Sequence, residues 1–71
     1  MPTIGQVVAA IADPGRQANF QNSVFYGLAQ VAINNNDPDA LIRAVITAFA
    51  SGLLTQPDVD AINAIDPGSP N

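Results

Sequence analysis

The side chains that could carry chemistry in this sequence are six carboxylates, all of them aspartates, and two arginines. Closely spaced carboxylates can hold a cation, and Asn35-x-Asp37-x-Asp39 matches the first three ligands of an EF-hand calcium loop. The match ends there, because Ala40 replaces the glycine of the sharp turn and Ile46 replaces the bidentate glutamate. We therefore expect no bound metal ion and no other cofactor.

A structural interpretation accounts for the aspartates better than a catalytic one does. Asp13, Asp37, Asp39 and Asp58 all fall at the expected starts of helices. A carboxylate at such a position accepts a hydrogen bond from a free backbone N–H and complements the positive end of the helix dipole. We therefore expect these side chains to act as helix caps.

The groups that usually activate a nucleophile are missing. The chain has no histidine, no cysteine and no lysine. Ser23, Ser51 and Ser69 therefore lack the imidazole or amine that would take their proton. The five glycines are scattered and form no phosphate-binding loop. We expect that the protein is not an enzyme, and that it has no catalytic residue and no small-molecule substrate.

The charge distribution argues against two further classes of partner. The segment 49–59 resembles the corner of a DNA-binding helix-turn-helix, but the second helix carries Asp58 and Asp60 and no cation. A net charge of −4 repels nucleic acid. No basic residues accompany an apolar helix face, and no apolar run reaches the ~20 residues that span a membrane. We expect a soluble protein, cytoplasmic at synthesis, that binds neither nucleic acid nor membrane.

The elements that position these side chains follow from prolines, glycines and hydrophobic periodicity. Proline suits the first turn of a helix, and glycine suits its end. These signals predict four helices over about 4–12, 15–34, 38–51 and 56–65, with Thr3 as the first cap and Gly52 as a left-handed stop. No stretch alternates with period two, so we expect an all-α fold: a small four-helix bundle or orthogonal array. A single domain over 1–65 is followed by a flexible tail, 66–71.

The long second helix is expected to place one apolar stripe against the core. Phe20, Val24, Leu28 and Val31 recur at the spacing of one helix face, and Phe25, Ala29 and Ile33 widen this stripe. Gly27 interrupts this helix, where glycine costs up to about 1 kcal/mol relative to alanine. Such a glycine either allows the close approach of another backbone or is merely tolerated.

The third helix has more apolar surface than one face needs. Within 38–51, Arg43 and Thr47 are the main polar residues after the first turn, so apolar side chains surround most of the helix. Such a helix is either the central core element or part of an exposed patch shared with its neighbours. For the exposed patch, the candidate protein contacts are the aromatic and large aliphatic residues Phe25, Tyr26, Phe49, Leu53 and Leu54.

The size of the chain also favours a protein partner. With 71 residues it buries only about 60% of the surface that its unfolded form exposes, and it has no cysteine to form disulfides. We therefore expect a structural or accessory subunit that self-associates or docks on a larger protein. The lysine-free, Ala/Asn/Asp-rich composition is similar to that of minor structural proteins of virus particles, particularly of bacteriophage heads and tails, and this similarity implies incorporation into a virion. The alternative is a small regulatory adaptor or inhibitor that binds its target through an apolar helix groove.

Overall fold

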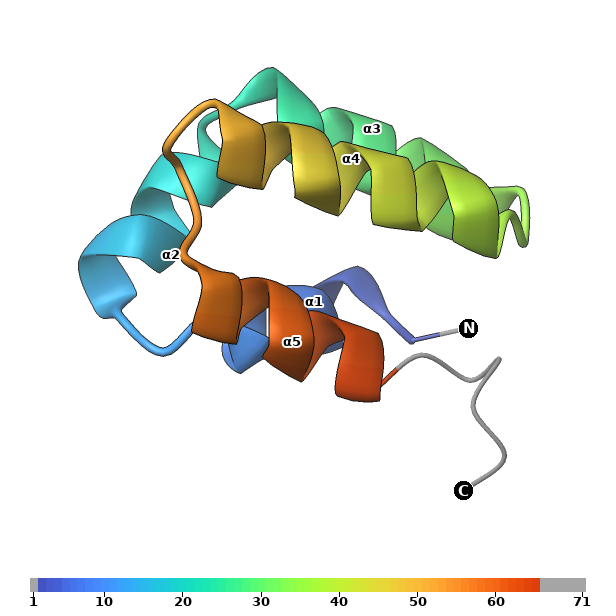
Figure 1. Ribbon diagram of the computed structural model, residues 1–71. Coiled ribbons are helices and arrows are strands. Elements are labelled where there is room, and N and C mark those ends of the chain that lie inside the picture. Colours follow the sequence, from blue (N-terminus) through green and yellow to red (C-terminus); the bar gives the residue numbers. More distant parts are fainter. Residues whose placement is uncertain (1, 66–71) are drawn as a thin grey trace.

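Helices make up most of the chain in the computed structural model, which describes residues 2–65. They are α1 (Ile4–Ala10), α2 (Pro14–Gln21), α3 (Val24–Asn34), α4 (Pro38–Ala50) and α5 (Gln56–Ala64) (Figure 1). No strand occurs in this part of the chain, and the predicted all-α fold class is confirmed. The predicted tail, 66–71, lies outside the described residues.

Local capping explains where several of these helices begin and end. The side chains of Thr3, Asp13 and Asp37 each accept a hydrogen bond from the backbone N–H three residues later, at 3.1, 2.9 and 3.1 Å. Asp39 lies in the first turn of α4. Gly52 has φ = 86°, a conformation that side-chain-bearing residues rarely adopt, and follows the end of α4. The predicted caps and the predicted glycine stop are therefore confirmed.

The single helix predicted over 15–34 is wrong, because the chain forms two helices there. Ser23 is extended, with φ = −99° and ψ = 163°, and separates α2 from α3. Its hydroxyl donates a hydrogen bond of 2.6 Å to the carbonyl of Phe20, and its backbone N–H donates to the same oxygen at 3.0 Å. Serine competes in this way with the helical hydrogen-bond pattern. The break changes the direction of the chain, so residues before and after it no longer share one helix face.

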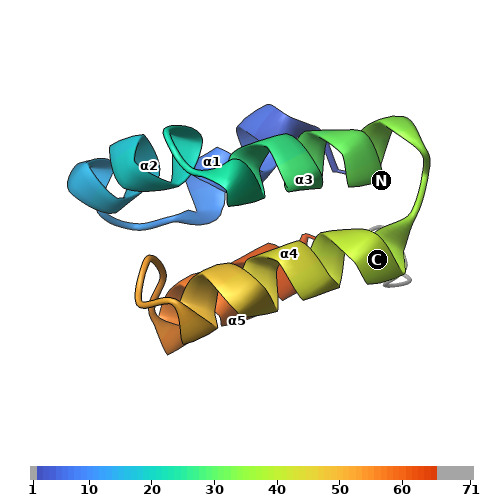
Figure 2. The same cartoon turned by 90° about the horizontal axis from the view of Figure 1, so that it is seen from above.

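The helices form two layers joined at one end. In the upper layer of Figure 1, α3 and α4 run antiparallel to each other. The lower layer holds α1 and α5, and the view from above in Figure 2 shows α1 behind α3 and α5 behind α4. Helix α2 connects the layers at one end. One face of the α3–α4 layer packs on the lower layer, and the opposite face is not covered by another described helix.

The hydrophobic core lies between these layers and draws on every helix. Phe20 is its largest fully buried side chain and makes an edge-to-face contact with Tyr26, with ring centroids 6.0 Å apart. Helix α4 contributes several buried residues, as the prediction of a central core helix requires, yet it also exposes apolar side chains. The buried core cluster consists of Val7, Ile11, Phe20, Ala29, Ala32, Leu41, Val45, Ala48, Leu54, Val59 and Ile62.

Candidate functional site

The five predicted interface residues do not form one surface patch. Phe49 is 38% exposed, whereas Leu54 is only 3% exposed and belongs to the core. Phe25, Tyr26 and Leu53 are half-buried and pack against the core cluster. Of the five, only Phe49 is therefore exposed.

The most exposed apolar surface lies on α3 instead. Val24, Leu28 and Val31 are 69%, 50% and 56% exposed, and we call these three residues the α3 ridge. The sequence pattern had placed them on a core stripe together with Phe20, but Phe20 alone is buried. This part of the stripe prediction is wrong, because the break at Ser23 rotates α3 relative to α2. The signal that could have revealed the ridge is Asn22-Ser23, since both residues are favoured at helix ends.

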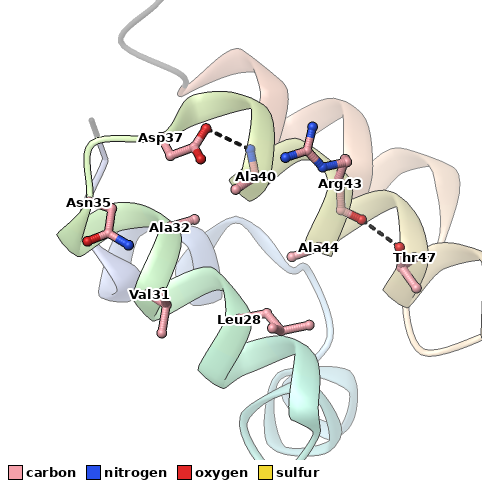
Figure 3. A pocket seen from close by; sticks show the side chains of 9 residues that line it. All are labelled: Leu28, Val31, Ala32, Asn35, Asp37, Ala40, Arg43, Ala44 and Thr47. Atoms are coloured by element: carbon pink, nitrogen blue, oxygen red, sulfur yellow. Dashed lines mark hydrogen bonds between the residues drawn. The ribbon is translucent and has the colours of Figure 1, made fainter.

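A groove runs beside the α3 ridge, between α3 and α4 (Figure 3). Ala32 and Ala44 face each other across it, and their small side chains leave the space between the helices open. The groove has a volume of about 310 Å³. Two members of the ridge, Leu28 and Val31, line it as well, so the ridge and the groove form one continuous surface. The α3–α4 groove is lined by Leu28, Val31, Ala32, Asn35, Asp37, Ala40, Arg43, Ala44 and Thr47.

Charges occur only on the α4 side of this surface. Helix α3 carries no charged residue, whereas Asp37 and Arg43 line the groove where α4 borders it. Asp37 is engaged as the cap of α4. Arg43 is exposed and forms no ion pair with any residue in 2–65. The centre of the surface is therefore apolar and uncharged, with a single free cation at its edge.

Gly27 lies on the exposed side of α3, beside the ridge. Helical periodicity places it next to Val24 and Val31, which are three and four residues away. A Cβ atom added to Gly27 would meet nothing within 4 Å, so no backbone in the described chain approaches it closely. The conformational cost of this glycine is therefore not offset by any close contact within residues 2–65.

A second polar site, centred on Asp58, is buried. The carboxylate is 1% exposed, and its Oδ2 accepts hydrogen bonds from Arg16 Nε at 2.8 Å and from the Thr55 N–H at 3.0 Å. Its Oδ1 accepts from the Ala12 N–H at 3.2 Å and from Arg16 Nη2 at 3.3 Å. The Thr55 bond confirms the predicted role of Asp58 in capping α5, but the sequence did not reveal the pairing with Arg16. One side chain thus ties the turn after α1, helix α2 and the start of α5 together.

The environment of Asp58 keeps it ionised. Burial alone would raise the pKa of this carboxyl, but the hydrogen bonds from Arg16, Thr55 and Ala12 outweigh burial and lower the pKa from 3.8 to about 2. Each carboxylate oxygen of Asp58 accepts two hydrogen bonds from donors inside the protein. Asp58 is therefore arranged to hold the helices together rather than to exchange protons with a substrate.

This pKa shift predicts a loss of stability in acid. A carboxyl whose folded-state pKa is lowered stabilises the fold fully above the unfolded pKa, here 3.8, and that contribution disappears as the pH falls through 2. We expect Asp58 to contribute about 2 kcal/mol to the free energy of unfolding at pH 7, all of it lost below pH ~2. Urea unfolding followed by circular dichroism at pH 7, 4 and 2 measures the change. An Asp58→Asn variant should lack this component, and parallel pH profiles for the two proteins would contradict the prediction.

Two other classes of site receive no support from the described residues. Asp37 is the cap of α4, and no group of three or more potential metal-ligating acids gathers anywhere in 2–65. Within the same range, no helix is long and apolar enough to cross a membrane. The α3 ridge with its groove, which combines exposed aliphatic side chains with a hollow, is the candidate functional surface.

Comparison with known proteins adds no family to this description. No protein-family model, no curated protein and no solved structure matches the chain significantly. A function for this protein therefore has to be argued from its own surface.

Proposed function

We propose that this protein is a non-enzymatic structural or accessory subunit that acts by packing against another protein chain in a larger assembly. The observation that carries the proposal is the α3 ridge: three aliphatic side chains at least half exposed on one face of one helix. Scattered apolar residues are normal on protein surfaces, but a contiguous apolar patch is typical of an interaction site.

The surroundings of the ridge support the same function. The groove beside it gives the surface relief, and the exposed Asn35 and Thr47 at its borders are polar groups of the kind found at interface rims. Phe49 and Ile46, 38% and 49% exposed, add a second apolar area on α4 that does not line the groove. Two helices of this small protein therefore expose apolar side chains to solvent.

The setting of the assembly is a finer proposal that rests on composition. The lysine-free, Ala/Asn/Asp-rich chain is similar to minor structural proteins of virus particles, and we propose a minor subunit of a virion, such as a bacteriophage head or tail. In that setting the chain would pack against a repeated structural subunit. A regulatory adaptor would use the same surface reversibly. The mass of the bound partner distinguishes a virion subunit from a regulatory adaptor.

Photo-crosslinking in the cells that naturally make the protein tests the proposed function. A photoreactive phenylalanine analogue replaces Val31 in one variant and, as a matched control, the exposed Asp60 of α5 in another. We expect protein adducts from position 31 at several times the yield from position 60, because only the ridge should be covered by a partner. Equal yields, or no adduct from position 31, would refute the proposal. The mass of the adduct identifies a second copy or a different protein.

A further inference from the structure

We infer that the α3 ridge and the α3–α4 groove bind a second copy of this chain and form a twofold-symmetric homodimer. The inference rests on the proposed function, since it names the partner of the same surface.

The surface is complementary to itself. The ridge residues Leu28 and Val31 border the groove, and Ala32 and Ala44 form its floor (Figure 3). Val24 continues the ridge along α3. A twofold axis that lies in the interface, parallel to α3 and midway between ridge and groove, places the ridge of each copy in the groove of the other. Such isologous contacts are the commonest in protein oligomers, and ridges packed into grooves are the usual geometry of helix contacts.

Gly27 fits the same arrangement. It lies on the exposed side of α3 next to Val24 and Val31, and a twofold axis in this position brings α4 of the partner over that side. A glycine allows the backbone of the partner to approach closely, whereas within residues 2–65 the space above Gly27 is empty. The dimer therefore gives this mid-helix glycine a role that the single chain does not.

The charges on the surface favour a second copy over a foreign, charged partner. The chain has a net charge of −4, so most contacts between two copies would be repulsive. Helices α1 and α3 have no charged side chain, and α3 is the one of the two that carries the exposed ridge, so two copies can meet along α3 without like-charge repulsion at the contact. A strongly acidic or basic partner would find nothing at the centre of the surface to recognise.

The uncovered face of the α3–α4 layer is also large enough for a stable dimer interface. The molecule measures 29 × 22 × 20 Å, so one of its long faces is about a fifth of its accessible surface of 3935 Å². That fraction is about 800 Å² per copy, which is the size of a standard stable interface. An interface of this size uses the whole uncovered face of the α3–α4 layer, including Asp37 and Arg43 beside the groove.

The oligomeric state in solution tests this inference. Sedimentation equilibrium of the purified protein across the micromolar range should give twice the mass of the chain, and the dimer should be tighter at high than at low salt, because salt screens the repulsion between two chains of net charge −4. Val31→Asp should weaken dimerisation about a hundredfold, since it buries an unpaired carboxylate. Ile46→Asp is the matched control, because Ile46 is also about half exposed but lies outside the groove, and it should leave the dimer intact.

Gly27→Ala tests the dimer with a variant that is not expected to unfold, so a loss of dimerisation cannot be explained by loss of the fold. In the single chain it should raise the thermal midpoint, because alanine is the better helix former. In the dimer its methyl group stands in the contact and should weaken association about tenfold. A variant that gains stability and loses dimerisation is the expected result, and an unchanged dimer affinity would exclude the close contact at Gly27.

The outcomes separate this inference from the proposed function. A wild-type chain that remains monomeric overturns the homodimer, and so does a dimer that Ile46→Asp dissociates and Val31→Asp does not. If the protein is monomeric but position 31 crosslinks to a heavier, different protein, the proposed function stands without the homodimer. If position 31 gives no adduct and the protein is monomeric, both are refuted.

Discussion

Replacing Asp58 by alanine is expected to lower the free energy of unfolding by about 3 kcal/mol or more. The substitution removes the acceptor of four hydrogen bonds, from Arg16 Nε and Nη2 and from the backbone N–H groups of Ala12 and Thr55. The two backbone groups are then left without their partner in a partly buried turn, which costs about 1–3 kcal/mol for each group that water cannot reach. For a chain of this length the total stability is roughly 4–10 kcal/mol, so the variant should be close to unfolding at room temperature. Urea unfolding by circular dichroism measures the difference.

The controls for Asp58→Ala come from the same helix and from the ion-pair partner. Asp60→Ala removes an exposed carboxylate whose contact is with Gln56 at 3.0 Å, and it should change stability by no more than about 0.5 kcal/mol. Arg16→Met should cost less than Asp58→Ala, because the Arg16 side chain is 32% exposed and the two backbone donors keep their acceptor. If Asp60→Ala and Asp58→Ala were equally damaging, the buried hydrogen bonds would not be what holds this corner together.

The role of Asp58 shows which contacts of this fold can be predicted from sequence patterns. Its place in a capping box is local information, since Thr55 and Asp58 are only three residues apart, and the sequence therefore predicted it. The partner Arg16 is 42 residues away, and no periodicity or spacing connects the two positions. The starts of α1, α2, α4 and α5 were predictable for the same local reason, whereas the start of α3 at Val24 was missed. The buried ion pair was not, because it depends on how α2 and α5 pack.

The α3 ridge illustrates a second limit of predicting structure from the sequence pattern. Phe20, Val24, Leu28 and Val31 have the spacing of one continuous helix face, so a helix over 15–34 was the natural prediction. A single extended residue, Ser23, invalidates it, because each residue after the break has a new orientation about the helix axis. The prediction of a surplus of apolar surface did not depend on this detail. The choice of Phe25 and Tyr26 as contacts did depend on it, since which face of α3 is buried decides which of its residues are accessible. Leu54 lies between α4 and α5 and is buried in the core there.

Phe20→Ala is the second substitution with a large expected effect, about 3–5 kcal/mol of lost stability. Phe20 is 0% exposed and is the largest fully buried side chain, so its removal leaves a cavity at the junction of α2 with the rest of the core. The edge-to-face contact with Tyr26 is lost as well, which adds about 0.5–1.5 kcal/mol to the loss from burial. Thermal unfolding followed by circular dichroism gives the size of the effect.

Val24→Ala is the informative comparison, because Val24 belongs to the same four-residue pattern as Phe20 but is 69% exposed. We expect it to change the stability of the single chain by less than about 0.5 kcal/mol, and the change should be measured under conditions in which any dimer is dissociated. A large loss from Val24→Ala would mean that the ridge already packs inside the single chain, which would leave no free surface for a partner. A small loss, beside a large one for Phe20→Ala, means that the fold does not need the ridge for its own stability. Its three aliphatic side chains are then available for contact with another chain, as the proposed function requires.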